Sequence, residues 1–216
     1  MELQITRGTH ATVMFSSPTS TVIVDPGAFG YPDEVNTADA VLVTHDHFDH
    51  VDLPSLTTSL ATNEKLAVYS PTPLELGEHS DRVTVVSEGD RFTVGDIDVE
   101  VVGKYQATAS IDDDAIPNVG YLIAGTVLHP GDQRQEITGV DTVITALAAP
   151  WQNNPQLEEH LRRVTPHRVI GTHDATLSDL GREFAQMTLE KIAKSYGGEA
   201  ITMNTGDTIT IETVKD

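Results

Sequence analysis

Three histidines and two aspartates occupy six consecutive positions, in the segment HDHFDH from His45 to His50. The whole chain has only nine histidines among 216 residues, so chance is a poor explanation for this cluster. The segment follows the apolar run AVLV, Ala40 to Val43, which predicts a buried strand. His45 and His47 are two residues apart at the end of that strand, so their rings point to one side and can converge on one ion. Asp49 and His50 follow where the chain turns, and they can face a second ion. Imidazole and carboxylate suit zinc, manganese, iron or nickel.

The same segment matches the HxHxDH motif of the metallo-β-lactamase superfamily. Other segments follow that superfamily's order, and they resemble the branch related to ascorbate-6-phosphate lactonase and N-acyl phosphatidylethanolamine phospholipase D. These segments are GTHATVMF and TVIVDP near the N-terminus, LHPGD from Leu128 to Asp132, and GTHDA from Gly171 to Ala175. The resemblance covers about Leu3 to Asn204.

The resemblance implies a set of metal ligands and one or two divalent ions, with zinc expected first and manganese, iron or nickel as alternatives. It implies that His45 and His47 hold the first metal. The second metal is then held by three further side chains: Asp49, His50 and His173. Asp132 would bridge the two ions with its carboxylate.

One position departs from the superfamily pattern. The first metal normally receives a third histidine from the end of a middle strand, but no histidine stands between His79 and His129. Gln106 stands at that place, and an amide oxygen is a weaker ligand than imidazole for these metals. Three outcomes stay open. Gln106 ligates weakly, the first metal is labile and held without it, or only the second metal binds.

Several residues around the motif have candidate roles. Asp49 or Asp132 could pass on the proton of the attacking water, and both are candidate catalytic residues. His129 is a candidate acid or substrate contact, with a structural histidine as the alternative. By resemblance, His10 lies near the pocket, and Asp25, which ends the run TVIVD, accepts a hydrogen bond that steadies the ligand loop. The remaining histidines are expected on the surface: His79, His160 and His167.

The elements that must position these residues are mostly short strands. Apolar, β-branched runs predict strands at LQIT, ATVMFS, STVIVD, AVLV, KLAVYS and RVTVVS, and again at VGYLIAG, TVLHPGD, DTVITALAA, RVIGTH, EAITMN and DTITIET. Gly95-Asp96 predicts a hairpin turn. Helices are expected at Leu53 to Ala61, Pro155 to Val164 and Leu177 to Tyr196, and TPLEL is expected to form a short helix or a turn. Strand runs mixed with strand–helix alternation favour an α/β fold of two face-to-face sheets with helices outside. The resemblance implies a four-layer αββα sandwich, and the length favours a single domain over residues 1–216.

Composition limits the partners. The 33 acidic and 13 basic side chains give a net charge of −20, which disfavours nucleic acid and makes this an acidic protein. There is no cysteine, so thiol nucleophiles and cysteine metal sites are excluded. No apolar run reaches the roughly 20 residues of a membrane helix, and the N-terminus does not resemble a signal peptide, so a cytoplasmic protein is expected. The oligomeric state is open.

The function expected first is metal-dependent hydrolysis of a small-molecule ester, lactone or phosphodiester by a metal-bound hydroxide. Lys104, Arg134 and Trp151 stand in or beside nearby loops and could contact the substrate. Two alternatives remain. One is a mono-iron oxygenase-type redox enzyme, and the other is a non-catalytic relic with a weakened first metal site.

Overall fold

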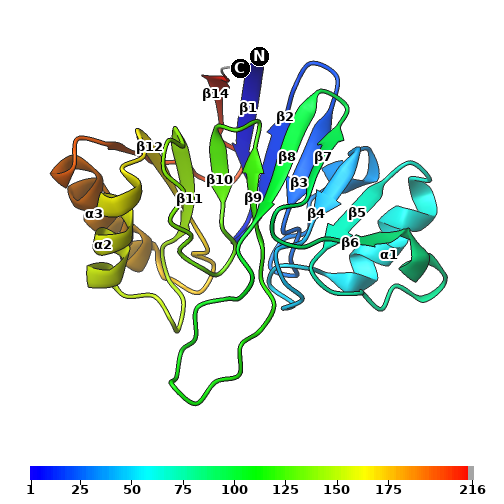
Figure 1. Ribbon diagram of the computed structural model, residues 1–216, viewed down its shortest axis with the longest axis horizontal. Coiled ribbons are helices and arrows are strands. Elements are labelled where there is room, and N and C mark those ends of the chain that lie inside the picture. The colour runs from blue at the N-terminus through cyan, green and yellow to red at the C-terminus, as the bar shows by residue number, and fades with distance from the viewer. Residues whose placement is uncertain (214–216) are drawn as a thin grey trace.

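The fold is built on two seven-stranded sheets that pack face to face, as a computed structural model of residues 1–213 shows (Figure 1). The first sheet has the order β14-β1-β2-β3-β4-β5-β6 and the second β13-β12-β11-β10-β9-β8-β7. The strands of the first sheet are β14 (Thr208–Glu212), β1 (Glu2–Arg7), β2 (Val13–Ser16), β3 (Thr21–Val24), β4 (Ala40–Leu42), β5 (Ala67–Ser70) and β6 (Val83–Val85). Those of the second are β13 (Glu199–Ile201), β12 (Arg168–Thr172), β11 (Thr142–Ala146), β10 (Val127–His129), β9 (Gly120–Ile123), β8 (Ile97–Val102) and β7 (Arg91–Val94).

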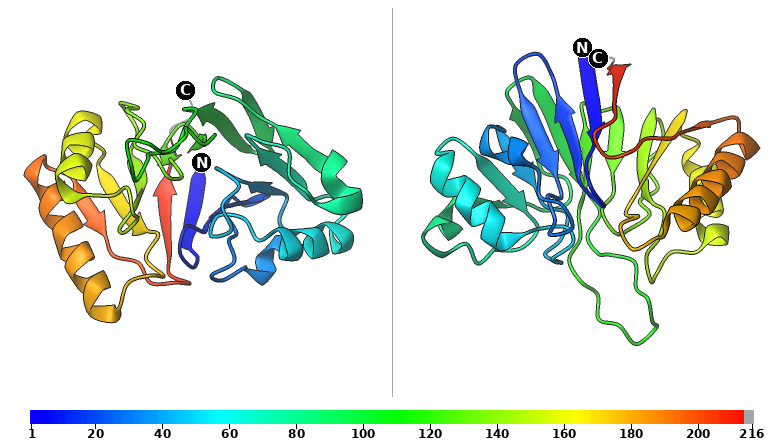
Figure 2. Two further views of the ribbon diagram at one scale, coloured as in Figure 1. Left: turned by 90° about the horizontal axis from the view of Figure 1, so that it is seen from below. Right: turned by 180° about the vertical axis from the view of Figure 1, so that it is seen from behind.

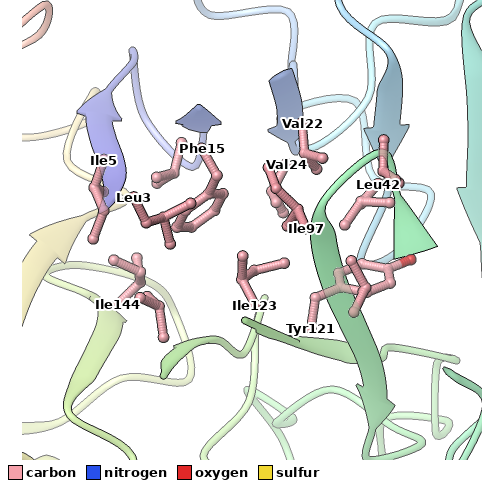
Figure 3. Close-up of a cluster of buried hydrophobic side chains, with 14 of the residues drawn as sticks. Leu3, Ile5, Phe15, Val22, Val24, Leu42, Ile97, Tyr121, Ile123 and Ile144 are labelled. Carbon is pink, nitrogen blue, oxygen red and sulfur yellow. The ribbon is translucent and has the colours of Figure 1, made fainter. Parts of the chain in front are cut away.

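Alternation along the strands divides the apolar side chains between two faces of each sheet. In β3, Val22 and Val24 point into the core between the sheets, while Ile23 points outward. The second sheet follows the same rule, since Ile144 of β11 points inward and Val143 outward. The close-up in Figure 3 shows side chains of both sheets meeting in this shared core.

The outward faces are covered by helices. Helix α1 (Leu53–Thr62) covers the first sheet, and α2 (Asn154–Val164) and α3 (Asp179–Ser195) cover the second. Seen from below, α1 lies on one flank of the molecule and α2 and α3 on the opposite flank (Figure 2). The four-layer αββα sandwich expected from the sequence is confirmed.

The expected strands and helices are present, with small shifts at their ends. Helix α3 begins at Asp179 rather than Leu177, because the Ser178 side chain accepts from the Gly181 amide and acts as the N-cap. The segment TPLEL forms no α-helix. Short 3-10 helices occur at Asp33–Asn36 and, directly after TPLEL, at Gly77–Arg82. Gly95 adopts the left-handed conformation that the hairpin between β7 and β8 requires.

Parallel pairing brings the carboxyl ends of several strands to one edge. Strands β3, β4, β5 and β6 are parallel neighbours in the first sheet, as are β10, β11, β12 and β13 in the second. The loops that follow β3, β4, β10 and β12 carry Asp25, His45, Asp132 and His173. Five described non-glycine residues have a positive φ, and three of them lie at this edge: His10, Asp25 and His173. Such conformations are unfavourable and cluster where function requires them.

Candidate metal centre

Four side chains from three separate loops converge around the position expected for the second metal. The carboxylate oxygen Asp132 Oδ1 lies 3.2 Å from His50 Nε2 and 3.5 Å from His173 Nε2. Asp49 Oδ2 lies 3.4 Å from His173 Nε2. His50 Nε2, His173 Nε2 and Asp132 Oδ1 are buried, and within residues 1–213 they have no hydrogen-bond partner. Buried polar atoms without a partner are costly, so this arrangement fits a cation placed among them.

The first metal position is less complete. His45 Nε2 lies 3.0 Å from His47 Nδ1, as expected for two rings that converge at the end of a strand. Asp132 Oδ2 lies 3.9 Å from His45 Nε2. That same oxygen accepts a hydrogen bond of 3.0 Å from Trp151 Nε1. The two carboxylate oxygens of Asp132 therefore face different positions, as a bridging ligand requires, and the oxygen that faces the first position is shared with Trp151.

Hydrogen bonds at Nδ1 prepare three histidines for metal binding. Asp25 accepts from the Thr44 amide, from Thr44 Oγ1 and from His50 Nδ1, each at 2.7 Å. Because the Thr44 hydroxyl proton goes to Asp25, its oxygen accepts from His45 Nδ1 at 3.1 Å. His173 Nδ1 donates to the Ala148 carbonyl at 2.6 Å. In the neutral form of each ring this leaves Nε2 as the unprotonated nitrogen, the one that can bind a metal.

His10 is oriented differently. The Ala175 amide donates to His10 Nδ1 at 3.1 Å, so the ring proton is on Nε2. Nε2 then donates to Asp49 Oδ2 at 3.2 Å. His10, Asp49 and His173 are close enough to form a metal-binding group by distance alone. The protonated Nε2 instead makes His10 a residue that orients the candidate ligand Asp49.

Gln106 lies in the loop beside Asp132. The amide of the next residue, Ala107, donates to the Asp132 carbonyl at 2.7 Å. Gln106 Oε1 is buried, and the described residues offer it no hydrogen-bond partner. An amide oxygen in this state is available as a weak ligand. The acidic run from Asp112 to Asp114 in the same loop is exposed.

Trp151 has a role that the sequence did not indicate. It precedes α2 and was expected only as a loop residue that could contact substrate. Its ring is nearly buried, it donates to Asp132, and the Arg134 guanidinium lies 5.1 Å from its centroid. No local motif marks this contact, because the two residues meet only through the packing of the loop before α2.

His129 is fully engaged by the backbone. Its Nε2 donates to the Ala11 carbonyl at 3.1 Å, and its Nδ1 accepts from the Gly131 amide at 3.4 Å. This placement supports a positioning role for His129 rather than proton transfer. The expectation that His160 lies on the surface is wrong, because it belongs to the buried face of α2 together with Leu157 and Leu161.

The carboxylates around the centre favour a positive charge between them. Burial lowers the pKa of His50, but the carboxylates of Asp25 and Asp132 outweigh burial and raise it to about 10. Burial raises the pKa of Asp132, and the neighbouring histidines reverse this and hold it below its usual value. Burial and the neighbouring His50 lower the pKa of His45 to about 3. The same carboxylates that favour a proton on His50 would favour a metal ion in place of that proton, while the ionised Asp132 and the neutral His45 are already in the states that bind metal.

Comparison with known proteins identifies the family. A model of the beta-lactamase superfamily domain matches residues 4–173. The chain belongs to this superfamily. A protein of Mycobacterium tuberculosis, Rv0786c, is 30% identical over 186 residues, covering 82% of this chain and 86% of its own. A hydroxyacylglutathione hydrolase of Actinobacillus pleuropneumoniae is 34% identical over 175 residues, covering 78% of this chain and 66% of its own. Among solved structures, the metallo hydrolase Igni18 of Ignicoccus hospitalis superposes with a TM-score of 0.74 at 15% identity, over 98% of this chain and 99% of its own.

These similarities confirm the resemblance read from HDHFDH and the coarser functional expectation. The protein is a metal-dependent hydrolase of the metallo-β-lactamase superfamily, with histidine and aspartate groups able to bind metal. Within residues 1–213, no helix is both long and apolar enough to cross a membrane.

Proposed function

We propose that this protein hydrolyses a small-molecule ester, lactone or phosphodiester at a centre of two unequal metal positions. The observation that carries the proposal is the convergence, at one edge of the two sheets, of buried ligand atoms of His50, His173 and Asp132 that have no hydrogen-bond partner among the described residues. The second position would be held by these three residues and Asp49. The first would be held by His45, His47 and Asp132, with Gln106 as a weak further ligand.

When bound, the metal ions supply Lewis acidity and lower the pKa of a water molecule toward neutrality. In this proposal Asp49 would take a proton from that water, and its Oδ2, 3.4 Å from His173 Nε2, supports the role. His10 keeps Asp49 in that orientation by donating to the same oxygen. Asp132 is held by Trp151, and both carboxylates keep a pKa below the usual range of the side chain.

The difference between the two positions follows from their donors. The second position has two imidazoles and two carboxylate oxygens, with both imidazoles fixed at Nδ1 by Asp25 and Ala148. The first has two imidazoles, one oxygen of Asp132 and, by the family resemblance, Gln106 where a third imidazole is usual. We therefore expect the second position to bind metal more tightly than the first.

The test is metal analysis of protein purified without added metal, with hydrolysis assays on a lactone, an aryl ester and a bis-aryl phosphodiester. Zinc or manganese at one to two equivalents, with turnover, is the expected result. One equivalent of iron without hydrolysis would support the mono-iron oxygenase alternative. Failure to bind metal or to turn over any substrate, even after reconstitution, would support the non-catalytic alternative.

A pair of variants tests the first position. His47→Ala removes one of its two imidazoles and is expected to abolish hydrolysis while the second position still binds metal. The matched control is His167→Ala, because His167 is exposed and, among charged side chains of residues 1–213, contacts only Asp141, at 3.6 Å. Unchanged turnover in His47→Ala would refute a role for the first position.

A further inference from the structure

Two phenylalanine side chains are exposed beside the metal ligands. Phe48, between the ligands His47 and Asp49 in sequence, is 66% exposed, and Phe29 is 44% exposed. Their ring centroids lie 5.6 Å apart at 62°, an edge-to-face contact. Phe29 also contacts the His10 ring edge-to-face at 4.8 Å. The pair therefore forms a continuous apolar surface that reaches the residue orienting Asp49.

This aromatic pair is fixed rigidly to the ligand loop. The Ala28 amide donates to the Phe48 carbonyl at 2.9 Å. A Cβ atom on Gly27 would lie 1.9 Å from the Asp49 carbonyl oxygen, so the two loops are in direct backbone contact. Because both rings are carried by these backbones, their distance from the metal ligands is set by the fold. Large apolar side chains that stay exposed next to a catalytic centre indicate a surface that a ligand covers.

The loop after β8 adds apolar side chains. It spans residues 103–119, carries Tyr105 at 55% exposure and a fully exposed Ile111, and is joined to Asp132 through the Ala107 amide. In Figure 1 it projects from the edge at which the metal ligands lie. Of the eight large apolar side chains that residues 1–213 leave exposed, four are on this loop or in the aromatic pair. Half of these exposed apolar side chains are therefore on the two loops beside the metal ligands and the loop after β8, and three of the others lie on α3.

Charge around the same loops disfavours an anionic substrate. Exposed carboxylates stand at Asp46 and at the run from Asp112 to Asp114. Of the neighbouring cations, Lys104 is paired with a carboxylate, whereas Arg134 keeps its positive charge because its hydrogen-bond partners are neutral amides. Lys104 pairs with Glu88 at 3.0 Å, and both terminal nitrogens of Arg134 donate to the side-chain oxygens of Gln152 and Gln156. A phosphodiester would meet like charge here, whereas a neutral carbonyl compound would not.

We propose that Phe29 and Phe48 form the apolar wall of the substrate site, and that the substrate is an uncharged ester or lactone with a medium-length acyl or an aryl group. This inference rests on the proposed hydrolase function and selects one of its substrate classes. In the reaction, the oxygen of water adds to the acyl carbon and the acyl C–O bond breaks. The alcohol oxygen takes one proton, and the acid product is released as carboxylate and a second proton.

The experiment compares 4-nitrophenyl octanoate with 4-nitrophenyl acetate in the metal-loaded wild type and in Phe48→Ala. We expect the variant to raise KM for the octanoate at least tenfold, equivalent to about 1.4 kcal/mol, with kcat little changed and the acetate less affected. Phe48→Leu keeps apolar area and is expected to retain most of the preference. The matched control is Phe184→Ala on α3, because Phe184 is also well exposed, at 59%, but lies on the outer helix layer.

A binding measurement separates this inference from the proposed function. Octanamide and acetamide are neutral and carry no ester bond, so calorimetric titration measures their affinity for the apolar wall without ester hydrolysis. If octanamide binds at least tenfold more tightly to the wild type than to Phe48→Ala while no ester, lactone or phosphodiester is hydrolysed, the apolar wall stands and the hydrolase function fails. If esters are hydrolysed with no chain-length preference, or bis(4-nitrophenyl) phosphate is the better substrate, the inference is overturned and the hydrolase function stands.

Discussion

Asp25→Asn is the perturbation that most directly tests how the centre is prepared for metal. Asp25 is fully buried and accepts three hydrogen bonds, from the Thr44 amide, from Thr44 Oγ1 and from His50 Nδ1. The Thr44 amide can only donate, so the oxygen of an asparagine must occupy the place of Oδ1. Its NH2 group then occupies the place of Oδ2, where it faces the Thr44 hydroxyl and His50 Nδ1.

The substitution therefore changes the proton on His50. An NH2 group facing Nδ1 requires that nitrogen to accept, which puts the ring proton on Nε2, the atom that faces Asp132. That tautomer cannot ligate a metal through Nε2. Loss of such a supporting carboxylate costs about 10- to 100-fold in metal affinity, or roughly 1.4 to 2.8 kcal/mol. Loss of a hydrogen bond to a buried charge also removes about 1.5–3 kcal/mol of folding stability.

The assay is competition between the protein and a zinc chelator of known affinity, with thermal unfolding of the metal-free protein measured alongside. The matched control is Asp46→Asn, which makes the same chemical change at an exposed aspartate of the same motif. We expect Asp25→Asn to weaken the tighter zinc equivalent at least tenfold and Asp46→Asn to leave it within about threefold. Equal zinc affinity in Asp25→Asn and the wild type would refute the argument from the His50 tautomer.

Three further predictions concern single contacts. Gln106→His supplies the missing imidazole, so we expect tighter binding of the second zinc equivalent in calorimetry; unaltered affinity would mean that this side chain does not face the first position. Trp151→Phe keeps a ring beside Arg134 but removes the donor to Asp132, and zinc competition should show about a tenfold loss of affinity; no loss would show that the indole N–H is dispensable. Burial lowers the pKa of His160 from its usual 6.5 to about 4 in the folded protein. The protein therefore has its full stability above pH 6.5 and loses part of it as the pH falls from 6.5 toward 4, because His160 is protonated first in the unfolded chain. Between pH 7 and 4.5 the wild type should lose about 2 kcal/mol more unfolding free energy than His160→Gln, and identical losses in denaturant titrations would contradict this assignment.

Local patterns in the sequence predicted most of the fold. β-branched runs, glycine turns and helix caps depend on residues a few positions apart, so the strands and helices were recognisable with errors of up to three residues at their ends. TPLEL was ambiguous because five residues do not distinguish a short helix from a turn. His160 was misassigned because its burial depends on which face of α2 meets the second sheet, and that is a tertiary property.

The sequence by itself determined the chemistry of HDHFDH, because the spacing of His45 and His47 at a strand end is sufficient to converge two rings. It also determined the order of the other candidate ligands, through the family resemblance. Only the tertiary structure decided which atoms support them. Asp25 reaches His50 across 25 residues, Trp151 reaches Asp132 from the loop before α2, and Phe29 meets Phe48 through the contact of two loops. Each of these contacts depends on how parallel strands and their loops meet at one edge of the two sheets, and no local pattern records that arrangement.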